Sequence, residues 1–237
     1  MLTIRRAADR GHTDLGWLDS RHTFSFGAYS DPAHMGFRAL RVMNEDRVAP
    51  GTGFGAHGHR DMEILSYVFE GTLAHKDSMA AEARMIRPNE VQAMSAGSGV
   101  IHSEFNPSST EPVHFLQIWI LPSQEDVPPS YQHVACAASE KRGVLRLIAG
   151  PDKHPDPPAV FIHQDARIYA TVLGEGESLD YRFAPGRKAW VQCALGQIDV
   201  NGLTLGAGDG LAATDETALR LRGASDAANE LLLFDLG

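Results

Sequence analysis

Short alternating segments recur along this whole chain and constrain its fold more than any other feature. In each of them apolar and polar residues alternate, or β-branched and aromatic residues are enriched, and turn residues follow. Successive side chains of a strand point to opposite faces, so the pattern predicts strands, whereas long helical periodicity is hard to find. The expected strands are His22–Phe26, Phe37–Val42, Glu63–Phe69, Leu73–Lys76, Ala83–Ile86, Val91–Met94 and Val113–Leu121, followed by Val144–Ala149, Arg167–Leu173, Ser178–Phe183, Ala189–Cys193, Gln197–Val200, Leu203–Leu205, Ala218–Arg222 and Leu231–Leu236. The sequence therefore predicts an all-β, antiparallel fold.

A polar, proline-bearing stretch at residues 121–131 separates two halves of the chain. Proline lacks the N–H that a sheet needs, so this stretch cannot continue a central strand. The halves are weakly similar: Phe69–Leu73 resembles Ala194–Ile198, and Arg87–Val91 resembles Gly206–Gly210 at a comparable spacing. One duplicated β unit explains this economically, and chance similarity between hairpins is the alternative. We expect an N-terminal domain of residues 1–130 and a C-terminal domain of residues 131–237.

Charge and composition exclude several classes of partner. Thirty acidic and 21 basic residues give a formal charge of -9, and no Lys/Arg-rich run offsets it. We therefore expect no direct nucleic-acid binding, while protein partners stay open. The chain lacks a run of about 18 apolar residues and a secretory signal, which predicts a soluble cytoplasmic protein without membrane contact. Cys136 and Cys193 lie outside any C-x-x-C pattern, so neither a disulfide framework nor a thiolate metal site is expected.

Two pairs of side chains indicate a metal site. His57 and His59 stand two residues apart in a glycine-rich segment, and His102 and Glu104 have the same spacing. Residues two apart on a strand share one face, so two facing pairs would close on one ion. Three imidazoles and a carboxylate suit Fe, Cu, Ni, Zn or Mn, and Glu63 is an alternative carboxylate. The remaining histidines, such as His12, His34, His75, His114, His133, His154 and His163, belong to no comparable pair and are expected to be solvated or structural.

The same segments carry a resemblance to a known family. The first motif of the cupin superfamily is matched by Gly51, His57, His59, Glu63 and Gly71, and the second by Gly97, Gly99, His102 and Asn106. Gly71 is one residue late, and Gly97 replaces the usual proline. With the pair His102 and Glu104 and the segment Arg-His-Thr-Phe-Ser-Phe-Gly at residues 21–27, these departures make the chain resemble the pirin family, in particular its bacterial quercetinase-like members, over nearly its whole length.

The resemblance implies a bicupin, with two antiparallel β-barrels or jelly rolls in one chain. It implies that the residues matching His57, His59, His102 and Glu104 hold one divalent transition metal in the first barrel. Iron is favoured, and copper, nickel, manganese, cobalt and zinc are alternatives. Glu63 is then expected to orient the ligands rather than to bind the ion.

The second half lacks a copy of this site. Aligning Gly196 with Gly71 places Arg182 and Ala184 where His57 and His59 would stand, and the segment near the counterpart of His102 contains no histidine. A degenerate second barrel without metal is therefore expected.

The resemblance also implies a function, that of a quercetin 2,3-dioxygenase-like enzyme, which opens a flavonol ring with O2 and releases carbon monoxide. The partners are then a small phenolic substrate and O2, and Glu104 is expected to accept the proton of the substrate hydroxyl. An apolar slot for a planar substrate is expected from Met43, Phe54, Met62, Phe105 and Trp119. The alternative is a non-enzymatic, metal-dependent, redox-sensing binding module, because family members in higher organisms resemble co-regulators that contact transcription factors.

Overall fold

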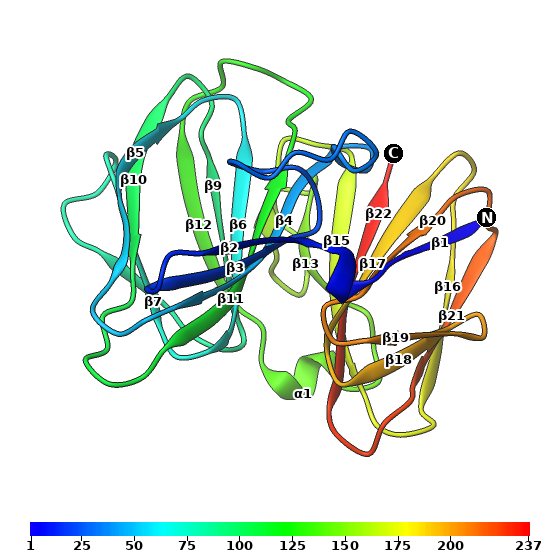
Figure 1. The fold of residues 1–237 in the computed structure, drawn as a ribbon. Coiled ribbons are helices and arrows are strands. Elements are labelled where there is room, and N and C mark those ends of the chain that lie inside the picture. The colour runs from blue at the N-terminus through cyan, green and yellow to red at the C-terminus, as the bar shows by residue number, and fades with distance from the viewer.

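The computed structural model describes residues 1–237 and is almost entirely β (Figure 1). The first part of the chain forms β1 (Leu2–Arg5), β2 (Gly11–Asp14), β3 (Leu18–His22), β4 (Leu40–Val48), β5 (Gly53–His59), β6 (Glu63–Glu70), β7 (Leu73–Asp77), β8 (Arg84–Ile86), β9 (Glu90–Ser95), β10 (Val100–Phe105), β11 (Val113–Ile120) and β12 (Ser130–Ala135). The second part forms β13 (Arg146–Gly150), β14 (Val160–Phe161), β15 (Ala166–Leu173), β16 (Ser178–Arg182), β17 (Lys188–Leu195), β18 (Gln197–Val200), β19 (Leu203–Gly206), β20 (Gly210–Ala213), β21 (Ala218–Gly223) and β22 (Asn229–Leu236). Two one-turn helices, η1 (Ala7–Asp9) and α1 (Ala138–Lys141), complete the fold, so no helix has the length or apolar character that crossing a membrane requires.

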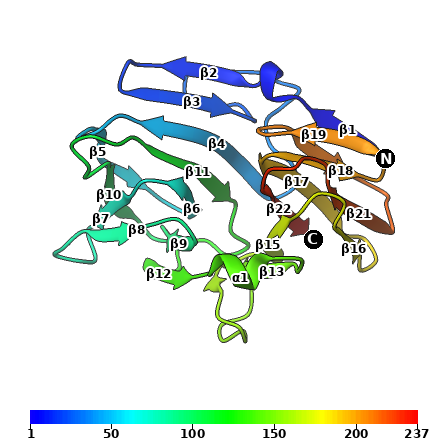
Figure 2. The same ribbon diagram turned by 90° about the horizontal axis from the view of Figure 1, so that it is seen from below.

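Each half is a jelly roll of one large and one small sheet. In the first half, a seven-stranded sheet in the order β12-β9-β6-β11-β4-β3-β2 faces the four-stranded sheet β5-β10-β7-β8 (Figure 2). In the second half, β1-β20-β17-β22-β15-β13-β14 faces β16-β21-β18-β19. The predicted all-β bicupin is confirmed, with each half formed by two facing sheets rather than by one closed barrel.

Two strands near the ends of the predicted domains pair with a sheet of the other half. Strand β1 at the N-terminus pairs with β20 of the second half, and β12 pairs with β9 of the first. The chain returns to the first half through η1, where Asp209 accepts hydrogen bonds from the backbone N–H of Ala7 and from the guanidinium of Arg6. No single residue therefore separates the sheets, and the division at residue 130 stays a prediction.

The two large sheets pack against each other around the largest hydrophobic cluster. Its members come from both sheets, are almost fully buried, and include Leu65, Leu116 and Ile118 of the first sheet and Ile168, Leu232 and Phe234 of the second. Burial of each such side chain stabilises the fold by roughly 1.5–3 kcal/mol. Polar groups cross the same boundary: Lys141 Nζ lies 2.7 Å from both Glu230 Oε1 and the Tyr67 hydroxyl. The halves therefore fold around one shared core.

Several predicted strands differ from the observed ones. Residues 23–26 are not a strand, because β3 ends at His22 and the chain turns there toward the isolated bridge between Phe26 and Tyr29. The strand expected at residues 37–42 begins at Leu40 and continues to Val48. The prediction did not include β1, β2, β5, β10, β12, β14 and β20. The three glycines of β5 are untypical of strands.

The internal similarity corresponds to equivalent turns in the two halves. Gly71 joins β6 to β7 at φ 76°, and Gly196 joins β17 to β18 at φ 71°. A Cβ atom at either position would lie 2.6 Å from a backbone oxygen, of Pro112 and of Ala228 respectively. Glycine is required at both turns by the left-handed backbone and by the close approach of the neighbouring chain.

Candidate metal centre

Strands β5 and β10 bring three histidines together. They pair antiparallel, with His57 opposite His102 and Val100 opposite His59. Ring centroids lie 4.8 Å apart for His57 and His59, 4.4 Å for His57 and His102, and 4.8 Å for His59 and His102. One ring nitrogen of each lies within 4.8 Å of the others. The structure therefore brings His57 and His59 together with His102, as the predicted facing of the two pairs requires.

Glycines permit this close strand pairing. A Cβ atom on Gly53 would lie 2.2 Å from the backbone oxygen of Glu104, so only glycine fits where β5 crosses the irregularity between His102 and Glu104. Gly97, before β10, has φ 43°, whereas proline fixes φ near about -65°. The departure of Gly97 from the usual cupin proline therefore has a local backbone cause.

The ring nitrogens of the cluster lack the partners that buried nitrogens normally have. His57 Nδ1 lies 2.7 Å from the Gly55 carbonyl oxygen, so its N–H donates there and Nε2 keeps its lone pair. His57 Nε2 lies 3.0 Å from His102 Nε2. His59 Nε2 and His102 Nδ1 are buried without any hydrogen-bond partner. Buried polar atoms without partners are rare in native proteins, and a bound cation explains the convergence of these lone pairs.

The electrostatics of the cluster favour neutral imidazoles. Burial lowers the pKa of His59 to about 4, and His57 lowers it further. Burial likewise lowers the pKa of His102 to about 2, with smaller effects from His57, His75 and His59. Near neutral pH these two rings are therefore unprotonated, which is the form that binds a metal ion.

Glu104 is buried beside His102 and has two polar partners. Ser66 Oγ donates to its Oε1 at 3.1 Å, and Gln117 Nε2 donates to its Oε2 at 2.5 Å. Burial raises the pKa of Glu104 to about 7, against the effect of these two hydrogen bonds, and Asp46 raises it further. Ligand atoms of Glu104, His75 and His102 lie within 4.8 Å of one another. Glu104 therefore lies next to His102. This histidine belongs both to the group with His75 and Glu104 and to the cluster with His57 and His59.

His75, which was expected to be solvated or structural, is a buried neighbour of the centre. It is 0% exposed, its ring centroid lies 5.2 Å from that of His102, and its Nε2 lies 3.1 Å from Asp77 Oδ2. Strand β7 pairs with β10 so that Glu104 stands opposite His75. The sequence spacing of His75 and Asp77, again two residues, was the signal for an inward-facing polar pair.

Glu63 does not contact the histidine cluster. Its Oε2 accepts a hydrogen bond from Ser95 Oγ at 2.6 Å, and its Oε1 lies 3.2 Å from His163 Nδ1. The expectation that Glu63 orients the ligands is therefore wrong, because its oxygens point to the boundary between the halves. His163, which was expected to be solvated or structural, is its partner there.

A cavity of about 200 Å³ opens beside the centre. Its wall includes His57, His59 and Glu104 together with the aromatic rings of Phe26, Phe54 and Trp119. An apolar groove lined by Trp17 and the same three rings adjoins it. The Trp119 ring stands 4.8 Å from that of His59 and 5.3 Å from that of Phe26, between centroids. The cavity thus has aromatic rings on its wall next to the histidine cluster.

The predicted slot residues are partly right. Phe54 and Trp119 line the cavity. Met43 belongs instead to the core between the halves, Met62 packs against the cluster around Ile64, and Phe105 is 44% exposed on the other face of β10. Phe26 was missed, although it lies in the segment 21–27 that carries the family resemblance.

The family membership of the chain follows from comparison with known proteins. The family model described as Pirin matches residues 3–120, and that described as Quercetinase C-terminal cupin domain matches residues 147–236. A protein of Escherichia coli K12 named quercetin 2,3-dioxygenase is 44% identical over 236 residues, which cover 100% of this chain and 99% of that protein. The chain belongs to the pirin family. A pirin-like protein of Caulobacter vibrioides is 38% identical over 225 residues, 95% of each chain.

Solved structures of pirin-family proteins have the same fold as this chain. The crystal structure of YhhW from Escherichia coli superimposes with a TM-score of 0.94 at 43% identity, covering 100% of this chain and 98% of that one. The same pirin in complex with nickel(II) gives a TM-score of 0.92 at 43% identity, with 100% and 99% coverage. A quercetin 2,3-dioxygenase of Acinetobacter baumannii matches at a TM-score of 0.74 and 20% identity, which shows the fold alone.

Proposed function

We propose that this pirin-family protein is a metal-dependent dioxygenase that opens the central ring of a flavonol such as quercetin. Each turnover consumes one O2 and releases one carbon monoxide. The observation that carries the proposal is that His57, His59 and the buried Glu104 line an aromatic-walled cavity, while His102 belongs both to the cluster with His57 and His59 and to the group with Glu104. The 44% identity to the Escherichia coli protein named quercetin 2,3-dioxygenase supports the substrate.

The donor set suits one divalent transition metal, with iron favoured, held by His57, His59, His102 and Glu104. The unpartnered His59 Nε2 and the lone pair of His57 Nε2 are the structural features that fit such an ion. When bound, the metal supplies a positive charge that lowers the pKa of a substrate hydroxyl.

In this proposal Glu104 accepts the proton of the flavonol 3-hydroxyl. Burial sets its pKa at about 7, so the carboxylate takes up and releases a proton near neutral pH, as a general base requires. The hydrogen bonds from Ser66 and Gln117 fix both of its oxygens. Glu104 thus acts as ligand and as proton acceptor in this proposal.

The aromatic rings position the substrate and exclude water. Phe26, Phe54 and Trp119 present flat apolar surfaces next to His59, and stacking of aromatic rings adds about 0.5–1.5 kcal/mol per pair to the burial of apolar area. A flavonol held between these rings has its oxygen-bearing edge toward the metal centre.

Turnover with defined metals tests the proposal. The protein is loaded in turn with Fe, Cu, Ni, Mn or Co and supplied with quercetin, and both oxygen uptake and carbon monoxide are measured. We expect enzyme-dependent carbon monoxide with at least one metal, and its loss in His57→Ala and His102→Ala. His133→Ala is the matched control, because His133 is exposed on β12. Carbon monoxide reports ring cleavage, whereas free metal oxidises flavonols without it.

One outcome would remove the dioxygenase assignment. If the folded protein binds its ion and no metal form yields carbon monoxide, the chemistry is not flavonol cleavage. The metal-dependent, redox-sensing binding module would then be the better account.

A further inference from the structure

The cavity has a second polar end, away from His57 and His59. Side chains of Thr13, Ser20, His22, Asn44 and Asp46 line it, and they come from the neighbouring strands β2, β3 and β4. Ser20, His22, Asn44 and Asp46 are each at most 3% exposed. Polar side chains at this degree of burial normally have defined partners.

Sheet register places these residues in rows that begin at the metal centre. Gln117 of β11, which donates to Glu104, stands opposite Asn44 of β4, and Asn44 stands opposite His22 of β3. Asp46 stands opposite Ser20, one inward position further along the same strands. Neighbouring strands lie about 4.8 Å apart, so the row from Gln117 to His22 spans roughly 10 Å. This length is comparable with the separation of substituents at opposite ends of a two-ring aromatic molecule.

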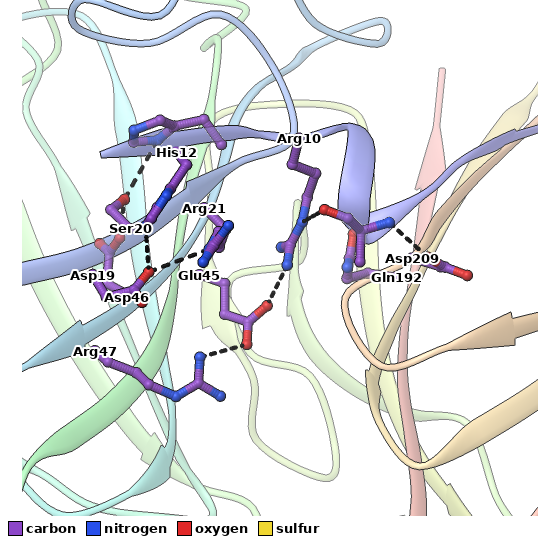
Figure 3. A network of polar contacts seen from close by, with 12 residues as sticks. Arg10, His12, Asp19, Ser20, Arg21, Glu45, Asp46, Arg47, Gln192 and Asp209 are labelled. Atoms are coloured by element: carbon purple, nitrogen blue, oxygen red, sulfur yellow. Dashed lines mark hydrogen bonds and ion pairs between the residues drawn. The ribbon is translucent and has the colours of Figure 1, made fainter. Parts of the chain in front are cut away.

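Hydrogen bonds hold the row in one orientation. His22 Nδ1 donates to Asn44 Oδ1 at 2.9 Å, and the Thr13 hydroxyl donates to His22 Nε2 at 2.9 Å. Ser20 Oγ donates to Asp46 Oδ1 (Figure 3). These bonds use one oxygen of Asn44 and one of Asp46. They leave a donor, Asn44 Nδ2, and an acceptor, Asp46 Oδ2, at the cavity wall without a partner in the protein.

Two adjacent carboxyl groups on β4 differ in their electrostatics. Glu45 points to the other face of the sheet, where Arg10 and Arg47 contact it (Figure 3). Burial would raise the pKa of Glu45, but His114 and Arg10 outweigh it and set the value at about 2. Burial raises the pKa of Asp46 to about 7, against its bond from Ser20. No cation faces Asp46, so its partner is to be sought in the cavity.

We propose that Asn44 and Asp46 form a specificity subsite that holds a hydroxyl group at the end of an aromatic substrate remote from the metal. A hydroxyl there accepts from Asn44 Nδ2 and donates to Asp46 Oδ2, while His22 and Ser20 position these two side chains. The inference rests on the proposed function and names its substrate class: flat aromatic compounds with oxygen substituents at both ends.

Ligand binding, followed by quenching of tryptophan fluorescence, tests the subsite without turnover. The two probes are quercetin and 3-hydroxyflavone, which keeps the metal-directed oxygens and lacks the hydroxyl groups on the outer rings. Both are titrated into metal-loaded and metal-free protein. We expect quercetin to bind at least about 10-fold more tightly in both forms, because one net hydrogen bond to a buried polar group is worth about that factor.

Variants of Asn44 and Asp46 test whether these two side chains cause the difference in affinity between quercetin and 3-hydroxyflavone. Asp46→Asn and Asn44→Leu keep the approximate shape and should bring the ratio of the two dissociation constants toward one. Asp19→Asn is the matched control, since Asp19 lies on β3 next to Ser20 but its side chain is 45% exposed, and it should keep the wild-type ratio.

The outcomes separate this inference from the proposed function. If no carbon monoxide is released but quercetin still binds more tightly than 3-hydroxyflavone, the dioxygenase assignment is wrong and the subsite stands. Equal dissociation constants in the wild-type protein overturn the subsite, whatever the activity, and this comparison needs no variant to fold. A ratio unchanged in both folded variants, with folding checked by thermal melting, overturns it as well.

Discussion

In the first half of the chain, the space between the two facing sheets holds histidines, carboxyl groups and amides beside an apolar cluster of seven buried residues. The same space in the second half is filled by aliphatic side chains, where 13 buried hydrophobic residues form one cluster. Strands β5 and β10 of the first half carry His57 opposite His102, whereas the corresponding paired strands β16 and β21 of the second half contain no histidine. One arrangement of strands therefore supports a polar centre in one half and an ordinary core in the other.

The difference indicates which half mainly stabilises the fold and which half carries the candidate site. Burying histidines and carboxyl groups costs free energy unless they are paired, and the first half has smaller apolar clusters, of seven and four buried residues, than the second. The cluster shared by the large sheets and the apolar interior of the second half compensate for this cost. The second half thus stabilises a fold whose first half is free to carry chemistry, as expected when function is a site placed on a fold.

The largest expected effect separates the two carboxyl groups of the first half. Glu104→Gln should lower turnover at least about 100-fold, because it removes a ligand and the proton acceptor. Glu63→Gln should leave metal occupancy unchanged, since Glu63 bonds to Ser95 and His163. Elemental analysis and carbon monoxide release measure both effects. Loss of the metal in Glu63→Gln with retention in Glu104→Gln would show that Glu63, and not Glu104, is the carboxylate ligand.

A second prediction concerns the apolar interior of the second half. Leu221 is 0% exposed within the 13-residue cluster, so Leu221→Ala should lower the free energy of unfolding by about 2–5 kcal/mol. Its metal content per folded chain should stay that of the wild type. Urea denaturation and elemental analysis of the same samples check this. A Leu221→Ala protein that is fully stable but metal-free would contradict the division between the halves.

The smallest effect is a pH dependence within the polar interior. Burial raises the pKa of Asp46 from 3.8 to about 7, so between these values the folded protein holds a proton that the unfolded chain releases. Stability is thus lost as the pH rises through this window, by on the order of 2–4 kcal/mol in total. Asp46→Asn removes this loss and should gain stability over the wild type at pH 8 more than at pH 5. Equal gains at both pH values in denaturant titrations would show that Asp46 ionises normally.

The fold and the histidine cluster were predictable from the sequence for local reasons. Alternation with period two marks half-buried strands, and the spacing of His57 with His59 and of His102 with Glu104 puts each pair on one face. The strands that carry these residues were missed: the glycines of β5 are untypical of strands, and β10 was not predicted although Val100, Ile101 and Phe105 favour a strand. Site spacing was here a better signal than strand composition.

The remainder of the site depended on tertiary structure. Glu63 has its partner His163 at a distance of 100 residues in sequence, which no local pattern reveals. Asn44 and Asp46, like Ser20 and His22, are polar residues two apart at inward positions of strands. Such pairs are the signal that was available, but only the sheet register shows that they continue the row from Gln117.

The location of the metal tests the central claim most directly. Crystals of protein purified without chelators, and loaded with one metal such as nickel or iron, are measured by anomalous diffraction at the absorption edge of that metal. The account predicts one peak per chain, among the rings of His57, His59 and His102 and next to Glu104, and its disappearance in His102→Ala. A peak between β16 and β21 in the second half, or two peaks of equal height per chain, would contradict it.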